Sequence, residues 1–200
     1  MESMLHFSRR IKLSIVFFAV VISGYVVVHL VASLGGVPQE FNEARLQGAL
    51  IAQNIVDLSN KSASDLGKIN ELDRQRNFNE ALALTTQVIA QSQEIRNQAV
   101  ALSSEIEKMT RSLSGIGSDE ARQAALESIT SRLALISRLI NYSASLENLL
   151  SVLRNRFAGA PSSHTKVQGM IDQINAEVTA INSFNNQAVQ AMERFDALIK

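Results

Sequence analysis

The sequence predicts an all-α protein: one transmembrane helix near the N-terminus, followed by an up-down-up-down antiparallel four-helix bundle. Three observations support this fold class. The chain of 200 residues is 46% hydrophobic, with only 2 Pro, 9 Gly and no Trp, a composition too apolar for disorder and too poor in turn formers for an ordinary β domain. An uncharged apolar run lies close to the N-terminus. Apolar residues then recur at steps of three and four, which is the period of an amphipathic helix.

The apolar run covers residues 13–34. At 1.5 Å per residue, about 22 residues span roughly 33 Å, which matches the thickness of a bilayer core. Arg9, Arg10 and Lys12 precede the run, so the positive-inside rule assigns residues 1–12 to a short cytoplasmic tail and the rest of the chain to the extracytoplasmic side. A cleaved signal peptide is the alternative, but its apolar core is usually shorter, about 7 to 15 residues. We therefore expect a single-pass membrane anchor.

The segment 35–38, Gly-Gly-Val-Pro, interrupts the helical pattern. Two flexible glycines followed by a proline suited to the first turn of a helix indicate a hinge between the anchor and the following domain. The first helix of that domain is predicted over about 39–74. The second is predicted over about 77–114, where Asn77 and Glu80 have the spacing of a capping box.

A turn is predicted at 114–118, with a glycine for the left-handed position that ends a helix and Ser118 as the N-cap of the next helix. The third helix is predicted over about 118–157 and the fourth over about 162–199. Four amphipathic helices of matched length, joined by short loops, have one economical arrangement. We therefore expect residues 39–200 to form an antiparallel bundle.

Antiparallel pairing places small polar side chains at similar heights in the predicted core. If the turns fall near Arg76, Gly117 and Ala160, the residues at similar heights are Ser62 or the nearby Ser59, Ser92 and Ser143, opposite the region around Ala176. Small hydroxyl side chains at facing core positions leave either a close approach of the helices or a small polar space. Tight packing and a ligand pocket are both compatible with this pattern.

The third helix carries two neighbouring apolar rows. One row, which includes Leu126 and Leu133, belongs to the periodic stripe expected to face the core. The second row widens the apolar arc of the helix, and it consists of Leu135, Leu139, Tyr142, Leu146 and Leu149, continued by Leu153. Either both rows lie inside the bundle, or the second row is partly exposed and contacts a partner, with Tyr142 as an amphipathic anchor.

Composition and motifs argue against several function classes. The 19 basic and 19 acidic residues give no net charge and are spread along the chain, so the basic face that nucleic-acid binding requires is missing. The absence of cysteine excludes disulfides and thiolate metal sites. The three histidines are scattered, and no histidine has a carboxylate three residues before it, as metal sites in helical bundles require. We expect no catalytic residue, no cofactor and no metal.

The predicted plan of an anchor followed by an extracytoplasmic four-helix bundle is similar in architecture to the sensory half of bacterial chemoreceptors. Our first hypothesis is a non-enzymatic, membrane-anchored envelope scaffold or interaction module that binds protein partners or copies of itself. The alternative is a sensor or ligand-binding bundle that signals through a partner subunit. A pocket with converging polar groups would favour the alternative.

Overall fold

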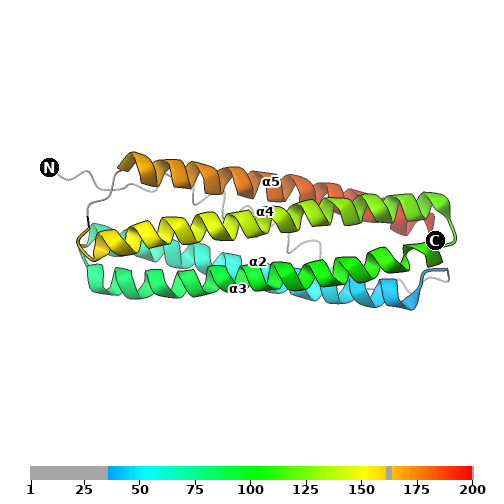
Figure 1. Ribbon diagram of the computed structural model, residues 1–200, viewed down its shortest axis with the longest axis horizontal. Helices are drawn as coiled ribbons and strands as arrows, with labels where there is room; N and C mark the ends of the chain where they lie inside the picture. Colours follow the sequence, from blue (N-terminus) through cyan, green and yellow to red (C-terminus); the bar gives the residue numbers. More distant parts are fainter. Residues whose placement is uncertain (1–35, 161–163, 200) are drawn as a thin grey trace.

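The computed structural model describes residues 36–160 and 164–199. These residues form four long α-helices and one short 3-10 helix, with no strand among them. The elements are α2 (Gln39–Arg74), α3 (Phe78–Ser112), η1 (Leu113–Gly115), α4 (Asp119–Phe157) and α5 (His164–Leu198). Figure 1 shows that consecutive helices run side by side in opposite directions. The predicted all-helical bundle is confirmed for this part of the chain.

The predicted cytoplasmic tail, 1–12, and the predicted transmembrane segment, 13–34, lie outside the described residues. Among the helices that are described, none is both long and apolar enough to cross a membrane. Of the predicted hinge, Gly36 has a φ of 107°, a conformation that favours glycine. Pro38 follows as the residue that precedes the first turn of α2.

Two helices end in the same backbone motif. After α2, Arg76 and Asn77 donate their N–H groups to carbonyls of the last turn, and after α4, Gly159 and Ala160 do the same. The first residue of each pair must adopt a positive φ. Gly159 does so at 93° without steric cost, whereas Arg76 does so at 57° with a side chain that disfavours it. The turn between α2 and α3 is therefore strained at one residue.

The helix starts differ in how well the sequence predicted them. Ser118 caps α4, because its Oγ accepts a hydrogen bond from the N–H of Ala121 at 3.2 Å, as predicted. The capping box predicted for α3 is wrong, since the Asn77 side chain makes no capping hydrogen bond. Asn77 has a ψ of 70° instead of the extended conformation of a cap, because its backbone already completes the end of α2.

The connection from α3 to α4 packs against the start of α2. The predicted left-handed glycine is wrong here, because neither Gly115 nor Gly117 has a positive φ and the 3-10 helix η1 makes the turn instead. Gly115 touches the ring of Pro38 so closely that an added Cβ would lie 2.6 Å from Pro38 Cγ. Gly115 is thus required for close approach and not for an unusual φ.

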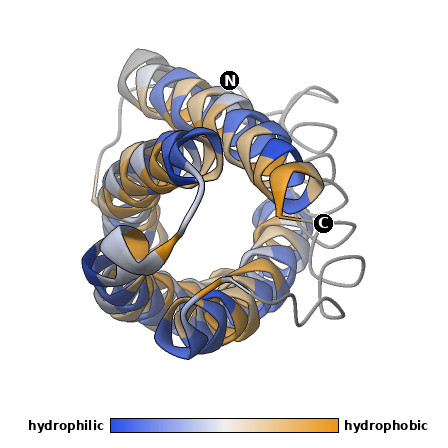
Figure 2. Ribbon diagram, turned by 90° about the vertical axis from the view of Figure 1, so that its right-hand side faces the viewer, coloured by the Kyte–Doolittle hydropathy of each residue, from blue (hydrophilic) through white to orange (hydrophobic). Residues whose placement is uncertain are grey.

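One apolar core runs through all four helices. Viewed along its axis, the bundle has the four helices arranged around a common centre (Figure 2). Each helix contributes side chains exposed by 2% or less, for example Ile55, Ile95, Leu146 and Ile181. Complete burial of such a side chain contributes about 1.5–3 kcal/mol, so packing alone can hold this cysteine-free domain together.

The four sides of the bundle are not equivalent. α2 packs along α3, α3 along α4 and α4 along α5, but α2 and α5 have no extended backbone packing. They meet at one end, where the Arg45 guanidinium donates two hydrogen bonds of 2.7 Å to the Asp196 carboxylate. The rings of Phe41 and Phe195 lie 5.3 Å apart at the same end. This contact joins the first and last helices at that end.

The opposite end of the bundle has its own cross-links. Arg156 of α4 pairs with Asp73 of α2 at 3.0 Å. The rings of Phe78 and Phe157 stack with centroids 6.1 Å apart and join α3 to α4. Both ends of the rod are thus fixed by contacts between helices.

Candidate functional site

The structure places the three predicted serines together inside the bundle. Ser62, Ser92 and Ser143 are all fully buried. Ser92 Oγ donates a hydrogen bond to the carbonyl oxygen of Ser143 at 3.0 Å, and Ser62 Oγ donates to Gln91 Oε1 at 2.8 Å. Because Gln91 directly precedes Ser92 on α3, the two contacts lie at one height. They join α2, α3 and α4 in a polar layer.

A carboxylate that was not among the predicted site residues, that of Asp65, extends this layer. Gln91 Nε2 donates to Asp65 Oδ2 at 3.0 Å, and Lys68 Nζ donates to Asp65 Oδ1 at 2.9 Å. Burial by itself would raise the pKa of Asp65. The hydrogen bonds from Gln91 and Lys68, with the charges of Lys68 and Lys61, outweigh burial and hold that pKa below its usual value. The layer therefore contains a buried negative charge.

The sequence signal for Asp65 is its position. It follows Ser62 by three residues and directly precedes Leu66, so it falls on the helix face that carries the core residues. A charged residue on such a face needs partners. One partner of the Asp65 carboxylate is the amide side chain of Gln91, which directly precedes the predicted core residue Ser92.

Two buried hydroxyls give this part of the bundle unused hydrogen-bonding capacity. Ser59 Oγ and Ser143 Oγ are buried without a hydrogen-bonding partner among the described residues. Ser59 lies one helical turn before Ser62 on α2, and Ser143 belongs to the layer itself. Buried polar groups are normally satisfied. These two hydroxyls could hydrogen-bond a small polar molecule.

The second apolar row on α4 does not form an exposed surface. Its five residues, each exposed by 8% or less, are Leu135, Leu139, Tyr142, Leu146 and Leu149. The interpretation of this row as an open partner surface is therefore wrong, and the alternative that it lies inside the bundle is right. Arg138, beside Leu139, pairs with Glu177 of α5 at 3.6 Å, which shows that α5 covers this flank of α4. Burial also raises the pKa of Tyr142 to about 12.

The row that we predicted to face the core is partly exposed instead. Leu126 is 43% exposed and Leu133 is 47% exposed. Both belong to the N-terminal half of α4. The prediction is wrong for these two residues, because α5 covers the opposite flank of the helix, and it is right for Ile129 and Ile136 of the same row, which are buried.

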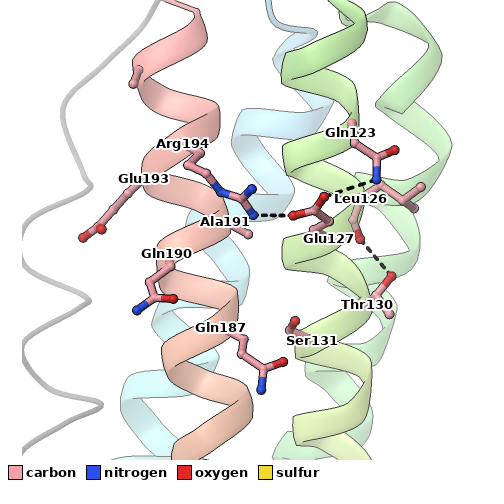
Figure 3. A pocket seen from close by; sticks show the side chains of 11 residues that line it. Gln123, Leu126, Glu127, Thr130, Ser131, Gln187, Gln190, Ala191, Glu193 and Arg194 are labelled. Carbon is pink, nitrogen blue, oxygen red and sulfur yellow. Dashed lines mark hydrogen bonds and ion pairs between the residues drawn. The ribbon is translucent and has the colours of Figure 1, made fainter.

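A groove lies on the outer surface between α4 and α5 (Figure 3). Arg194 of α5 and Glu127 of α4 form an ion pair across it, and Gln123 Nε2 donates to Glu127 at 3.2 Å. The hydrogen bond from Arg194 is the main reason that the pKa of Glu127 is lowered. Glutamine side chains from both helices, Gln123, Gln187 and Gln190, line the groove. Such neutral amides suit contact with a protein surface.

No group of three His, Cys, Asp or Glu side chains that could hold a metal ion occurs in the described ranges. Comparison of the chain with models of known protein families, with curated proteins and with solved structures found no match. The described part of the chain is a helical bundle with a polar layer inside it and a groove lined partly by glutamines on its surface.

Proposed function

We propose that this chain is a single-pass, membrane-anchored helical-bundle protein that acts without catalysis as a scaffold or protein-interaction module of the cell envelope. The anchor would be the apolar segment 13–34, with the basic residues before it in the cytoplasm. The bundle would then stand on the extracytoplasmic side.

The observation that carries this proposal is the continuous core of a long rod. α4 has 39 residues, which corresponds to about 58 Å at 1.5 Å per residue. The Arg45–Asp196 and Arg156–Asp73 pairs join helices far apart in the sequence, one pair at each end. A rod fixed in this way holds its side surfaces at a defined distance from the membrane.

The positions at which α2 begins and α5 finishes support the same proposal. α2 begins and α5 finishes at the end where Arg45 meets Asp196. An anchor that precedes α2 would therefore place this end beside the bilayer and the turn between α2 and α3 away from it. The groove between α4 and α5 would lie in the membrane-proximal part, because it includes Arg194.

The cysteine-free sequence allows a direct test of the topology. Asn60→Cys places a single thiol on an exposed position of α2, and Ser8→Cys places one in the predicted tail. In intact cells a membrane-impermeant maleimide should label Asn60→Cys only, and Ser8→Cys should be labelled after permeabilisation. The chain should also remain in the membrane pellet after alkaline carbonate extraction. The reverse labelling pattern, or release by carbonate, would contradict the proposal.

The sensor alternative is favoured by one observation, the unpartnered hydroxyls of Ser59 and Ser143 in the bundle interior. A ligand that binds only the folded state raises its Tm. Thermal unfolding with a panel of free amino acids and small carboxylic acids tests this alternative. A Tm increase that disappears in Ser143→Ala would support a ligand-binding function. An equal increase in both proteins would place binding elsewhere.

A further inference from the structure

A periodic stripe, distinct from the buried second apolar row, runs along the outside of α4. Its members follow one another at steps of three and four residues, and none of them is charged: Gln123, Leu126, Thr130, Leu133, Ser137 and Ile140. Leu126 and Leu133 are 43% and 47% exposed. Ile140 is half-buried, and the three polar members are exposed. We call these six residues the α4 outer stripe.

The apolar members of the α4 outer stripe repeat at the interval of a coiled coil. Leu126, Leu133 and Ile140 are spaced by seven residues. Within the stripe, one uncharged polar residue lies between each two of them, first Thr130 and then Ser137. This interval keeps the same side chains against a neighbouring helix turn after turn. The outward face of a bundle helix usually carries charged residues, so an uncharged stripe here indicates a surface for another helix.

The charges beside the stripe indicate the orientation of that helix. Arg122 directly precedes Gln123, and Glu127 directly follows Leu126, so the two lie on opposite sides of the stripe, five residues apart. In a parallel pair of identical helices, side chains with this spacing face each other across the seam. Arg122 of one copy would then face Glu127 of the other. An antiparallel pair would place the two positions on different sides and lose this complementarity.

Both charged side chains have room for such a contact. The Arg122 side chain is 42% exposed and the Glu127 side chain is 41% exposed. Within the chain, Arg122 contacts Asp119 and the carbonyl oxygen of Ile116, and Glu127 contacts Arg194 and Gln123. A guanidinium has five N–H donors and a carboxylate about four acceptor sites, so each group has capacity for a further partner.

We propose that the α4 outer stripe is a self-association seam through which two copies of this chain pair side by side and in parallel. The inference rests on the proposed function, because anchors in one membrane hold all copies in the same orientation. The proposed seam also names one partner of the scaffold, which is a second copy of the same chain. Pairing would bury Leu126 and Leu133, and it would also cover the α4 side of the groove, whose lining includes Gln123, Leu126 and Thr130.

Single cysteines in the full-length chain test this seam, since the natural sequence has no thiol to interfere. Leu126→Cys places identical positions opposite each other only in a parallel pair, whereas Leu133→Cys, at the middle of the stripe, does so in either orientation and tests the seam alone. Leu50→Cys, at a residue 49% exposed on α2, is the matched control. In native membranes treated with a mild oxidant, we expect at least fivefold more covalent dimer from each stripe variant than from the control.

A charge exchange tests the register independently. Arg122→Glu should reduce the dimer yield of Leu126→Cys several-fold, and adding Glu127→Arg should restore it. Equal yields from Leu126→Cys and Leu50→Cys would overturn the seam. Crosslinking that requires mixing Leu126→Cys with Ile140→Cys would overturn the parallel orientation. If the seam were right and the membrane anchor wrong, the stripe variants would still form the covalent dimer, but alkaline carbonate would release the chain from the membrane.

Discussion

The hydroxyl of Ser92 donates a hydrogen bond to the carbonyl oxygen of Ser143 on the facing helix, 3.0 Å away. Both residues are fully buried. Ser92→Leu should therefore overpack a tight layer and lower the free energy of unfolding by about 1–3 kcal/mol. Ser92→Ala, the control, should lose only the hydrogen bond, about 0.5–1.5 kcal/mol. Denaturant unfolding of the full chain in detergent measures both. A stabilised Ser92→Leu protein would instead reveal an unfilled cavity at this layer.

The two apolar rows of α4 should respond oppositely to the same substitution. Leu139 is 1% exposed and Leu133 is 47% exposed. Leu139→Ala should cost about 2–5 kcal/mol, because it leaves a cavity in the core. Leu133→Ala should change stability by less than about 0.5 kcal/mol in the dissociated chain. Chemical unfolding at low protein concentration compares them, and similar losses at the two sites would refute the assignment of the rows.

Gly115 and Gly117 form a matched pair in the turn between α3 and α4. A Cβ at Gly115 would lie 2.6 Å from the rigid ring of Pro38, whereas a Cβ at Gly117 would have no neighbour within 4 Å. Gly115→Ala should lower the free energy of unfolding by about 1–3 kcal/mol, since the start of α2 must move. Gly117→Ala should be neutral or slightly stabilising. Thermal unfolding of the two variants is sufficient; a neutral Gly115→Ala would mean that the contact with Pro38 yields easily.

Arg76 is the strained counterpart of Gly159. Arg76→Gly should stabilise the chain by roughly 0.5–1 kcal/mol, because relief of the positive φ is partly offset by the greater freedom of glycine in the unfolded state. Gly159→Ala introduces the same strain after α4 and should destabilise by a similar amount. Urea titrations of both variants check the pair. Destabilisation by Arg76→Gly would show that the arginine side chain contributes more than its backbone costs.

Asp65 should make part of the stability of the bundle sensitive to acid. Its pKa in the folded state lies below the ordinary value of 3.8, so the unfolded chain takes up the proton first as the pH falls. The stability from this group is full above about pH 5 and is lost as the pH falls through the folded pKa. Asp65→Asn removes this contribution. Its unfolding free energy should therefore fall less steeply than that of the natural chain between about pH 5 and pH 3. Parallel acid dependence in the two proteins would exclude a role for this carboxylate.

The helical period was sufficient to predict the elements and their pairing. It placed the helices close to their observed bounds, as at Gln39–Arg74. It also brought Ser92 to the height of Ser143, because antiparallel register follows from helix lengths and turn positions alone. These properties depend on local spacing, which a single sequence records.

The period could not decide which flank of α4 faces inward. Leu133 and Leu135 both lie within a wide apolar arc, and only the position of α5 determines that Leu135 is covered. The pair of Asp65 and Gln91 depends on the same kind of contact between helices. The backbone at Arg76 was missed for another reason, since an arginine gives no signal for the left-handed conformation. What the sequence left open was therefore lateral packing and one strained turn.

The Arg45–Asp196 contact has a consequence for the order in which the bundle assembles. It joins residues 151 positions apart, whereas the extended helix interfaces are all between neighbours in the chain. Neighbouring helices pair after closing short loops, but the contact between the first and last helices must close nearly the whole domain. During synthesis, α2, α3 and α4 can thus pack in turn, and α5 completes the structure last. The junction between the first and last helices therefore forms only after the final helix has been made.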